Sequence, residues 1–271
     1  MIGQRCVQQQ IKAEIENRSL ARFIILVGDV GSGRKTLAKE IAKLTDSEYV
    51  VVDKGVDAVR EVIEQSYTVS ANVLYVLDGN SMSNASKSAI LKVTEEPPNK
   101  ARFVLIVTDL SDTLPTLVSR ARVFRMDNYT DADIAYFAGT EDTRFPNFCS
   151  NKLEVDLLKG YGIDEFTDFV NVVVDNISEV ESANAFKIED KIAFKDETDK
   201  YDVKIFLQAF RTVCMQRIQE SEDYWDKLRY IQWVSVTTQK LSLLRVNSLN
   251  RSALFDMWIF DIRKVAFDAN S

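Results

Sequence analysis

The sequence predicts an α/β protein with a parallel, doubly wound sheet in its N-terminal half and helices in the remainder. Short, nearly continuous apolar runs at 23–27, 73–77 and 103–107 are typical of strands buried on both faces of a parallel sheet. Amphipathic helical patterns separate these runs, and a Gly-rich turn follows the first of them. This alternation of strands and helices, which continues to Met126, indicates βαβ units.

The composition narrows the class of protein. The chain has 271 residues, of which 46% are hydrophobic and 28% charged, as in ordinary globular proteins. Its net charge of −7 argues against long-range attraction to nucleic acid by the whole protein, although a local basic patch remains open. Three distant cysteines and no histidine give no metal-binding spacing and suit a reducing compartment. Without a long apolar run or a signal-peptide pattern, we expect a cytoplasmic protein with no membrane partner.

Strands and helices alternate through the N-terminal half. Strands are expected at 23–27, 49–52, 73–77, 103–107 and 123–126, and helices at 7–16, 36–44, 56–65, 84–95 and 114–118. The helix at 84–95 should end before Pro97 and Pro98, and the helix at 114–118 should open at Pro115. The alternation of these elements indicates a doubly wound α/β fold.

The strand patterns stop after Met126. Thr130 or Asp131 can cap a helix through Phe137, and Pro146 is expected to break the chain. Further helical patterns lie at 155–161, 163–180, 202–220, 224–244 and after Asn250, and the charged segment 195–200 reads as a linker. The C-terminal half is therefore expected to be all α, in two parts divided near residue 197.

The Gly-rich turn G-D-V-G-S-G-R-K-T at 28–36 is a candidate phosphate site. Gly28, Gly31 and Gly33 would let successive backbone N–H groups converge on phosphate oxygens. The helix that follows adds positive potential at its N-terminus. A Gly-rich turn without any ligand is the structural alternative.

Three residues after the glycines depart from the usual phosphate-binding pattern, which is GxxxxGK followed by Ser or Thr. Arg34 stands at the Lys position, Lys35 at the Ser/Thr position, and Thr36 comes one residue late. Lys cannot ligate Mg²⁺, and Arg is not a neutral replacement for this Lys. A one-residue bulge would bring Lys35 and Thr36 into place, but nothing in the sequence requires it.

Polar residues also end two of the predicted strands. Asp78 follows the strand at 73–77 and Thr108 follows the strand at 103–107, and ligands of open α/β sheets lie at such strand ends. An Asp beside a phosphate-binding loop positions Mg²⁺ through water, and ATPases of this type usually carry an acidic residue directly after it. Here that residue is Gly79, and an Asp-Gly turn is the structural alternative for Asp78. Thr108 could contact a γ-phosphate or cap the next turn.

Arg120 is the candidate for a role outside the chain's own site. It follows a Pro-initiated turn and has no evident acidic partner nearby in the sequence. An exposed Arg in such a place can reach into a neighbouring subunit's nucleotide site as an arginine finger. A surface salt bridge is the alternative.

Several blocks together resemble one family, the AAA+ subunits of sliding-clamp loaders. This family includes bacterial gamma/tau and delta-prime and the small subunits of replication factor C. The blocks occur in the family's order: Ile2-Gly3-Gln4, the loop 28–36, V-D-A-V-R (56–60), L-Y-V-L-D (74–78), A-I-L-K-V-T-E-E-P-P (89–98), T-L-P-T-L-V-S-R (113–120) and N-S-L-N-R-S-A-L (247–254).

The resemblance implies an AAA+ nucleotide-binding module at 1–128, a small helical lid at 129–196 and a helical collar at 197–271. The implied partners are other clamp-loader subunits in a hetero-oligomeric ring, the sliding clamp and, through the complex, primer-template DNA. ATP or ADP is the implied ligand, with Mg²⁺ expected only where a nucleotide binds.

The departures from the family pattern point to one kind of subunit. The family's S-R-C block reads Ser119-Arg120-Ala121, the acidic residue after Asp78 is missing, and the four-Cys zinc module and the lid's sensor Arg are absent from the sequence. A damaged loop with a kept finger resembles delta-prime, which completes its neighbour's site without being an ATPase on its own. The compact form would also fit a phage or mobile-element version.

Two other functions stay open at this point. One is an active clamp-loader ATPase that uses Lys35, Thr36 and Asp78 in a bulged loop. The other is a DNA-binding initiator or helicase-loader relative, against which the acidic balance and the lack of a helix-turn-helix pattern count.

Overall fold

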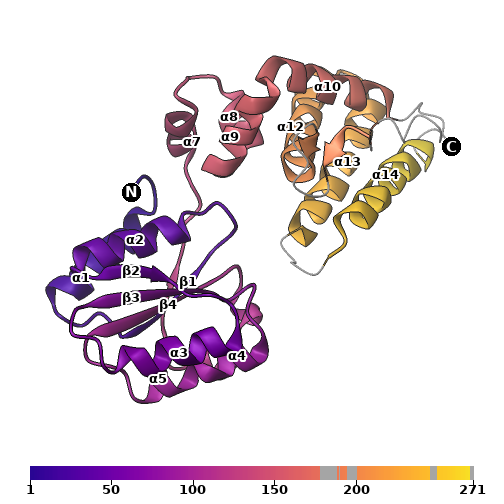
Figure 1. Cartoon of the computed structure of the whole chain (residues 1–271). Helices are drawn as coiled ribbons and strands as arrows, with labels where there is room; N and C mark the ends of the chain where they lie inside the picture. The colour runs from indigo at the N-terminus through magenta and orange to yellow at the C-terminus, as the bar shows by residue number, and fades with distance from the viewer. Residues whose placement is uncertain (178–187, 189, 194–199, 245–248, 269–271) are drawn as a thin grey trace. The chain divides into compact units, whose positions relative to one another are not determined.

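The computed structural model describes residues 1–177, 188, 190–193, 200–244 and 249–268. The chain forms two compact units, Met1–Tyr129 and Thr130–Ser271 (Figure 1). None of the helices within the described residues is long and apolar enough to cross a membrane. The predicted boundary between 196 and 197, most of the charged segment 195–200 and the last residues of the helix predicted at 163–180 lie outside the described residues.

The first unit is built on a five-stranded parallel sheet, as the sequence predicts. Its strands follow the order β2-β3-β4-β1-β5, and all neighbouring pairs are parallel. Their bounds lie within two residues of those predicted: β1 Phe23–Val27, β2 Glu48–Val51, β3 Val73–Asp78, β4 Ala101–Val107 and β5 Arg122–Arg125. The three strands with the most apolar sequences, β3, β4 and β1, are therefore adjacent at the centre of the sheet.

Helices cover both faces of this sheet (Figure 1). Helices α1 and α2 lie on one face, and α3, α4 and α5 lie on the other. Their bounds, with those of the short helices near the sheet edge, are α1 Arg5–Glu16, α2 Arg34–Leu44, α3 Val56–Ser66, α4 Asn84–Ala89, α5 Leu91–Glu95, η1 Leu110–Asp112 and α6 Pro115–Val118.

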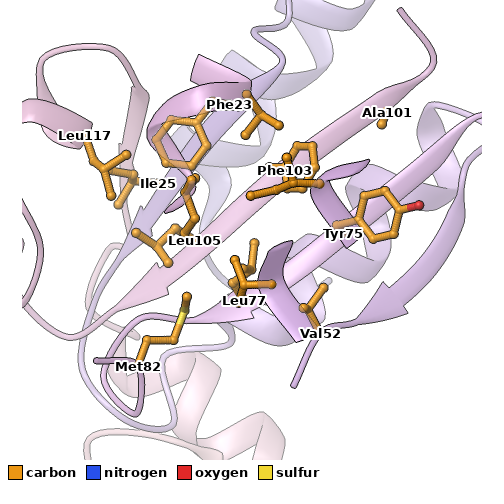
Figure 2. Close-up of a cluster of buried hydrophobic side chains, with 14 of the residues drawn as sticks. Phe23, Ile25, Val52, Tyr75, Leu77, Met82, Ala101, Phe103, Leu105 and Leu117 are labelled. Atoms are coloured by element: carbon orange, nitrogen blue, oxygen red, sulfur yellow. The ribbon is translucent and has the colours of Figure 1, made fainter. Parts of the chain in front are cut away.

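Alternate residues of each strand build two separate cores. Ile24 and Leu26 of β1 pack with apolar residues of α1 and α2, whereas Phe23 and Ile25 pack with those of α3 and α5. The second of these cores holds the stacked rings of Tyr75 and Phe103 on neighbouring strands (Figure 2). Burial on both faces explains the continuous apolar sequences of β1, β3 and β4.

The single helix predicted at 84–95 is two helices that meet at Ile90. The Ile90 N–H donates to the carbonyl of Lys87 at 3.2 Å, and the Val93 N–H donates to the carbonyl of Ile90 at 3.1 Å. These i to i−3 bonds tighten the backbone locally and separate α4 from α5. Ser83 caps α4 by accepting from the Ser86 N–H at 3.1 Å.

The second unit is mostly helical. The helices whose bounds the structure describes in this unit are α7 Asp131–Ala138, α8 Arg144–Phe148, α9 Lys152–Tyr161, α10 Ile163–Asn176, α12 Val203–Glu220, α13 Tyr224–Leu243 and α14 Arg251–Asp268. The predicted caps are confirmed at Thr130, which accepts from the Asp133 N–H, and at Asn250, which accepts from the N–H groups of Ser252 and Ala253.

Two sequence predictions for this unit were wrong. Pro146 does not break the chain but lies in the first turn of α8, where a missing N–H costs no intrahelical bond. The unit is also not all α, because a two-residue parallel strand pair joins β6 Ile192–Ala193 to β7 Tyr201–Asp202. Pairs this short leave no alternating pattern in a sequence.

The core of α12, α13 and α14 is aromatic. Phe210, Trp233, Phe255 and Trp258 are fully buried, and both indole N–H groups are satisfied within the unit. Phe255 and Trp258 are therefore core residues of this unit, and their side chains are not available for contacts with a neighbouring subunit. Among the α14 side chains whose exposure is described, the large apolar ones at the surface are Met257 and Phe260.

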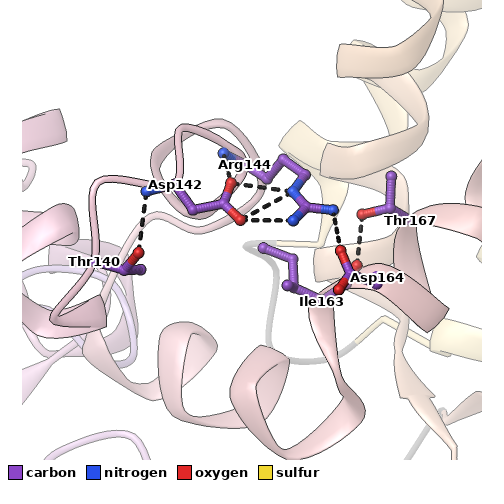
Figure 3. Close-up of polar contacts among 6 residues, drawn as sticks. All are labelled: Thr140, Asp142, Arg144, Ile163, Asp164 and Thr167. Atoms are coloured by element: carbon purple, nitrogen blue, oxygen red, sulfur yellow. Dashed lines mark hydrogen bonds and ion pairs between the residues drawn. The ribbon is translucent and has the colours of Figure 1, made fainter.

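An ionic cluster ties the start of α8 to the start of α10 (Figure 3). The Arg144 guanidinium lies 2.7 Å from Asp142 Oδ2 and 2.7 Å from Asp164 Oδ1. Hydrogen bonds from Arg144 hold the pKa of the Asp142 carboxyl below its ordinary value. The cluster therefore fixes the loop that leads into α8.

Candidate functional site

The Gly-rich turn, Asp78 and Thr108 meet at one edge of the sheet. They follow or end β1, β3 and β4, which are neighbours and run in the same direction. The Gly28 N–H donates to the carbonyl of Val107 at 3.2 Å, and the Gly79 N–H donates to the carbonyl of Ile106 at 2.8 Å. These bonds extend the sheet into the loops that carry the candidate residues.

The glycines of the turn are required by its conformation. Gly31 and Gly33 have φ values of +86° and +89°, which favour glycine. A Cβ at Gly28 would lie 2.7 Å from Met126 Cβ, so the turn passes too close to the end of β5 for a side chain. Gly33 is the N-cap of α2, whose first residue is Arg34.

Helix α2 directs Arg34 inward and the next two residues outward. Arg34 is only 8% exposed, whereas Lys35 and Thr36 are exposed. The helix is regular from Arg34 onward, and its phase is fixed by Leu37 and other buried residues on one face. The structure thus places Arg34 at the turn and lacks the bulge that would bring Lys35 and Thr36 into the site.

The charges of three carboxylates act on the buried guanidinium. Burial lowers the pKa of Arg34, and the charges of Asp78, Asp29 and Asp112 act in the opposite direction. The group remains a cation, because guanidinium does not lose its proton in proteins. Among the described residues, Arg34 Nη1 has no hydrogen-bond partner, and neither has the buried hydroxyl of Ser32 in the loop.

Asp78 and Thr108 belong to a hydrogen-bonded network. Asp78 Oδ1 accepts from the N–H of Asn80 at 3.2 Å, and Asn80 Oδ1 accepts from the Thr108 N–H at 2.9 Å. The Thr108 hydroxyl lies 2.5 Å from Asp112 Oδ2, which forms a capping box with Asp109. Thr108 therefore takes part in closing the turn before η1, and Asn80 is a site residue that the sequence did not indicate.

The space beside Gly79 is filled. A Cβ there would lie 2.6 Å from Val107 Cγ1, 3.1 Å from Leu105 Cδ1 and 3.2 Å from the Ile106 carbonyl oxygen. The position that carries the acidic residue in hydrolytic relatives of the fold is therefore packed against β4. A longer side chain could be accommodated only if the sheet edge moved.

Gln4 is a second site residue that sequence reasoning did not single out. Its amide accepts from the Asp127 N–H at 2.6 Å, donates to the Asp127 carbonyl at 2.6 Å and donates to the Ser32 carbonyl at 3.3 Å. The Tyr129 hydroxyl also donates to Ser32 at 3.1 Å. Gln4 thus fastens the Gly-rich turn to the segment after β5, and the block Ile2-Gly3-Gln4 was the available signal.

Arg120 lies beyond the end of α6, with its side chain 42% exposed. Its Nη1 donates to the Thr116 carbonyl at 3.1 Å, and its Nη2 lies 3.6 Å from Glu95 Oε1. The acidic partner that the local sequence lacks therefore comes from α5, in the block 89–98. The guanidinium remains partly accessible to solvent.

Comparisons with known proteins agree with the motifs. Residues 45–130 match the family described as "DNA polymerase III, delta subunit". The chain is 25% identical over 169 residues to DNA polymerase III subunit gamma of Buchnera aphidicola subsp. Schizaphis graminum, covering 51% of this chain and 47% of the relative. It is 40% identical over 73 residues to DNA polymerase III subunit delta' of Escherichia coli strain K12, covering 26% and 22%.

The fold has a solved counterpart. A DNA polymerase III gamma subunit-related protein from Thermotoga maritima superposes with a TM-score of 0.53 at 17% identity, covering 96% of this chain and 99% of the other. This likeness confirms the predicted fold class. The chain spans about half the length of the curated gamma subunits that it matches, and a smaller part of the tau subunit of Bacillus subtilis strain 168. Together, the sequence matches and the motifs support the resemblance of this chain to the AAA+ subunits of clamp loaders.

Proposed function

We propose that this protein is a clamp-loader subunit of the delta-prime kind. In this role it supports the ring and lends Arg120 to a neighbouring ATPase subunit, without turning over ATP at its own site. The family supports the general role, since its relatives are the gamma and delta' subunits of DNA polymerase III. The packed position of Gly79 is the observation that supports the more specific part of the proposal, that the chain does not turn over ATP at its own site.

A P-loop ATPase needs a group beside the Mg²⁺-positioning Asp to orient the attacking water. In this chain the group would have to project from Gly79, where Val107 and Leu105 already fill the space. The Mg²⁺ ligand of the loop is also replaced, because Lys35 stands where Ser or Thr is needed and is turned to solvent. Both departures argue against hydrolysis at this site.

Arg120 has the properties that a finger acting on a neighbour requires. The guanidinium is exposed, carries a permanent charge and presents a planar set of donors suited to phosphate. Its bonds to Thr116 and Glu95 leave it at the surface and do not bury it. Aimed at a neighbour's γ-phosphate, such a group accelerates hydrolysis by roughly 10³ to 10⁵ in other NTPases.

The test is Arg120→Ala in the assembled complex, with the neighbour's ATPase measured in the presence of clamp and primed DNA. We expect turnover to fall at least about tenfold while the complex stays intact, and Arg120→Lys to rescue poorly because a point charge lacks the planar fork. Arg122→Ala is the matched control, since this residue is 46% exposed and also ion-paired, to Glu14. Unchanged turnover in an intact Arg120→Ala complex would remove the finger and leave a scaffold.

The active-ATPase alternative makes the opposite prediction for the isolated chain. We expect no ATP hydrolysis above background, because the loop lacks its Mg²⁺ ligand and Gly79 has no carboxylate. Phosphate release that disappears in Asp78→Ala would favour the alternative. The initiator or helicase-loader alternative has no support in the comparisons given above.

Partners and domain roles belong to the same proposal. The expected partners are other clamp-loader subunits, the sliding clamp and primer-template DNA, all in the cytoplasm. The lid at 129–196 and the collar at 197–271 remain predictions, with the exposed Met257 and Phe260 of α14 as candidates for collar contacts.

A further inference from the structure

The AAA+ fold implies a nucleotide held with Mg²⁺, and the residues of this loop fit only the nucleotide. Mg²⁺ needs oxygen ligands, which P-loops supply from the Ser or Thr after the Lys and from an Asp at a strand end. Here Asp78 is present, but Lys35 occupies the Ser/Thr position and faces solvent. A cation, the Arg34 guanidinium, is already buried where the charge of Asp78 acts on it.

The phosphate-binding half of the loop is intact. The left-handed Gly31 and Gly33 lead into the N-terminus of α2, a helix of 11 residues. The exposed fraction of Arg34 is below one tenth, and its Nη1 has no hydrogen-bond partner among the residues described. The Ser32 hydroxyl, also buried, is likewise unpaired within the described chain. Buried donors without partners are costly unless a ligand satisfies them.

We propose that the Gly-rich turn and Arg34 bind the diphosphate group of a nucleotide without magnesium, with the Arg34 guanidinium in the place of the metal ion. A guanidinium has five donors, so it can bond phosphate oxygens while its charge offsets Asp29, Asp78 and Asp112. An added divalent ion would be repelled by this buried cation. The inference deepens the proposed function, because it concerns the chain's own site, but it does not involve Arg120 or ring assembly.

The experiment is titration calorimetry of the isolated full chain with ADP, once with excess Mg²⁺ and once with EDTA. We expect the two dissociation constants to agree within about twofold, and Arg34→Ala to weaken binding at least tenfold. Lys43→Ala removes an exposed cation at the other end of α2 and is expected to leave binding unchanged. Circular dichroism verifies that each variant is folded. If Arg34→Ala does not fold, Arg34→Lys, which keeps the charge, replaces it as the test variant.

The double variant Arg34→Lys with Lys35→Thr restores the sequence GxxxxGKT beside Asp78. In this variant Mg²⁺ should tighten ADP binding at least tenfold, since the metal regains a ligand and loses the competing cation. Inorganic pyrophosphate serves as a second probe, and equal affinity for it would assign recognition to the phosphates alone. Wild-type binding that needs Mg²⁺, or no wild-type binding in either buffer, would overturn the proposal, and so would full binding by folded Arg34→Ala.

Discussion

At the scale of single residues, the candidate site shows how packing adds to what a motif says. Sequence alone indicates that Gly79 lacks the acidic side chain of an ATPase. Packing adds that this position also lacks the space for one, because Val107 Cγ1 would lie 2.6 Å from any Cβ. The sequence at position 79 thus lacks the carboxylate, and the side chains of β4 leave no space for one.

Gly79→Ala should destabilise the first unit by about 1–3 kcal/mol, because the new methyl group overpacks the edge of β4. Gly55→Ala is the matched control: its φ is −65°, and no described atom lies within 4 Å of the added Cβ. There the change should stay within about 0.5 kcal/mol. Urea unfolding of both variants gives the comparison, and equal stability of the two would contradict the packing argument.

The same scale shows which site residues a sequence can reveal. Arg34, Asp78 and Gly79 were predictable, because the loop and strand-end patterns fix their positions relative to one another. Glu95 was not, because its pairing with Arg120 depends on how α5 packs beside α6 and not on any local pattern. Asn80 and Gln4 were missed for the same reason, since their partners are 28 and 123 residues away.

At the scale of secondary-structure elements, two tryptophans join helices α13 and α14 by hydrogen bonds. The Trp258 indole N–H donates to the Thr237 hydroxyl at 3.0 Å, and the Trp233 indole N–H donates to the Ile262 carbonyl at 3.0 Å. Both rings are fully buried. Each bond joins α13 to α14, so the pairing of these helices depends on polar groups inside an apolar core.

Thr237→Val tests this arrangement, since it keeps the shape of the side chain and removes the acceptor. The buried indole N–H of Trp258 would lose its partner, at a cost of about 1–3 kcal/mol. Thr238→Val, the next residue on α13, is exposed and bonds only to its own helix at Val234 among the contacts described. Chemical denaturation should show a clear loss for Thr237→Val alone, and similar curves for both variants would refute the role of the bond.

Helix ends and helix interiors differ in how well the sequence predicted them. The caps at Thr130 and Asn250 were predictable, because a short polar side chain at the first free N–H groups acts locally. The break at Ile90 was not, because the residues around it have no local feature that ends a helix. Pro146 misled for a related reason, since its effect depends on its place within the helix.

At the scale of the whole molecule, the structure has two compact units, whereas three domains were predicted. This difference determines which fragments of the chain should fold by themselves. The first unit holds a complete sheet with a core on each face, both closed within residues 1–129. The second unit continues through the predicted boundary near 197. Phe169 of α10 packs on Tyr201 and on Phe206 of α12, with ring centroids 5.1 and 5.8 Å apart.

A fragment of residues 1–129 should therefore unfold in one cooperative transition, whereas a fragment of 1–196 should fold its first unit and leave the α10 face uncovered. Losing Tyr201 and Phe206 exposes Phe166 and Phe169, so the longer fragment should bind a hydrophobic dye and self-associate, and the shorter one should not. Neither fragment should join a clamp-loader complex, because both lack the helices from α12 onward. Dye fluorescence, light scattering and co-purification distinguish these outcomes.

A monomeric 1–196 fragment without dye binding would instead support a domain boundary near 197. Entry of this fragment into the complex would show that the last three helices are not what holds this subunit in the ring.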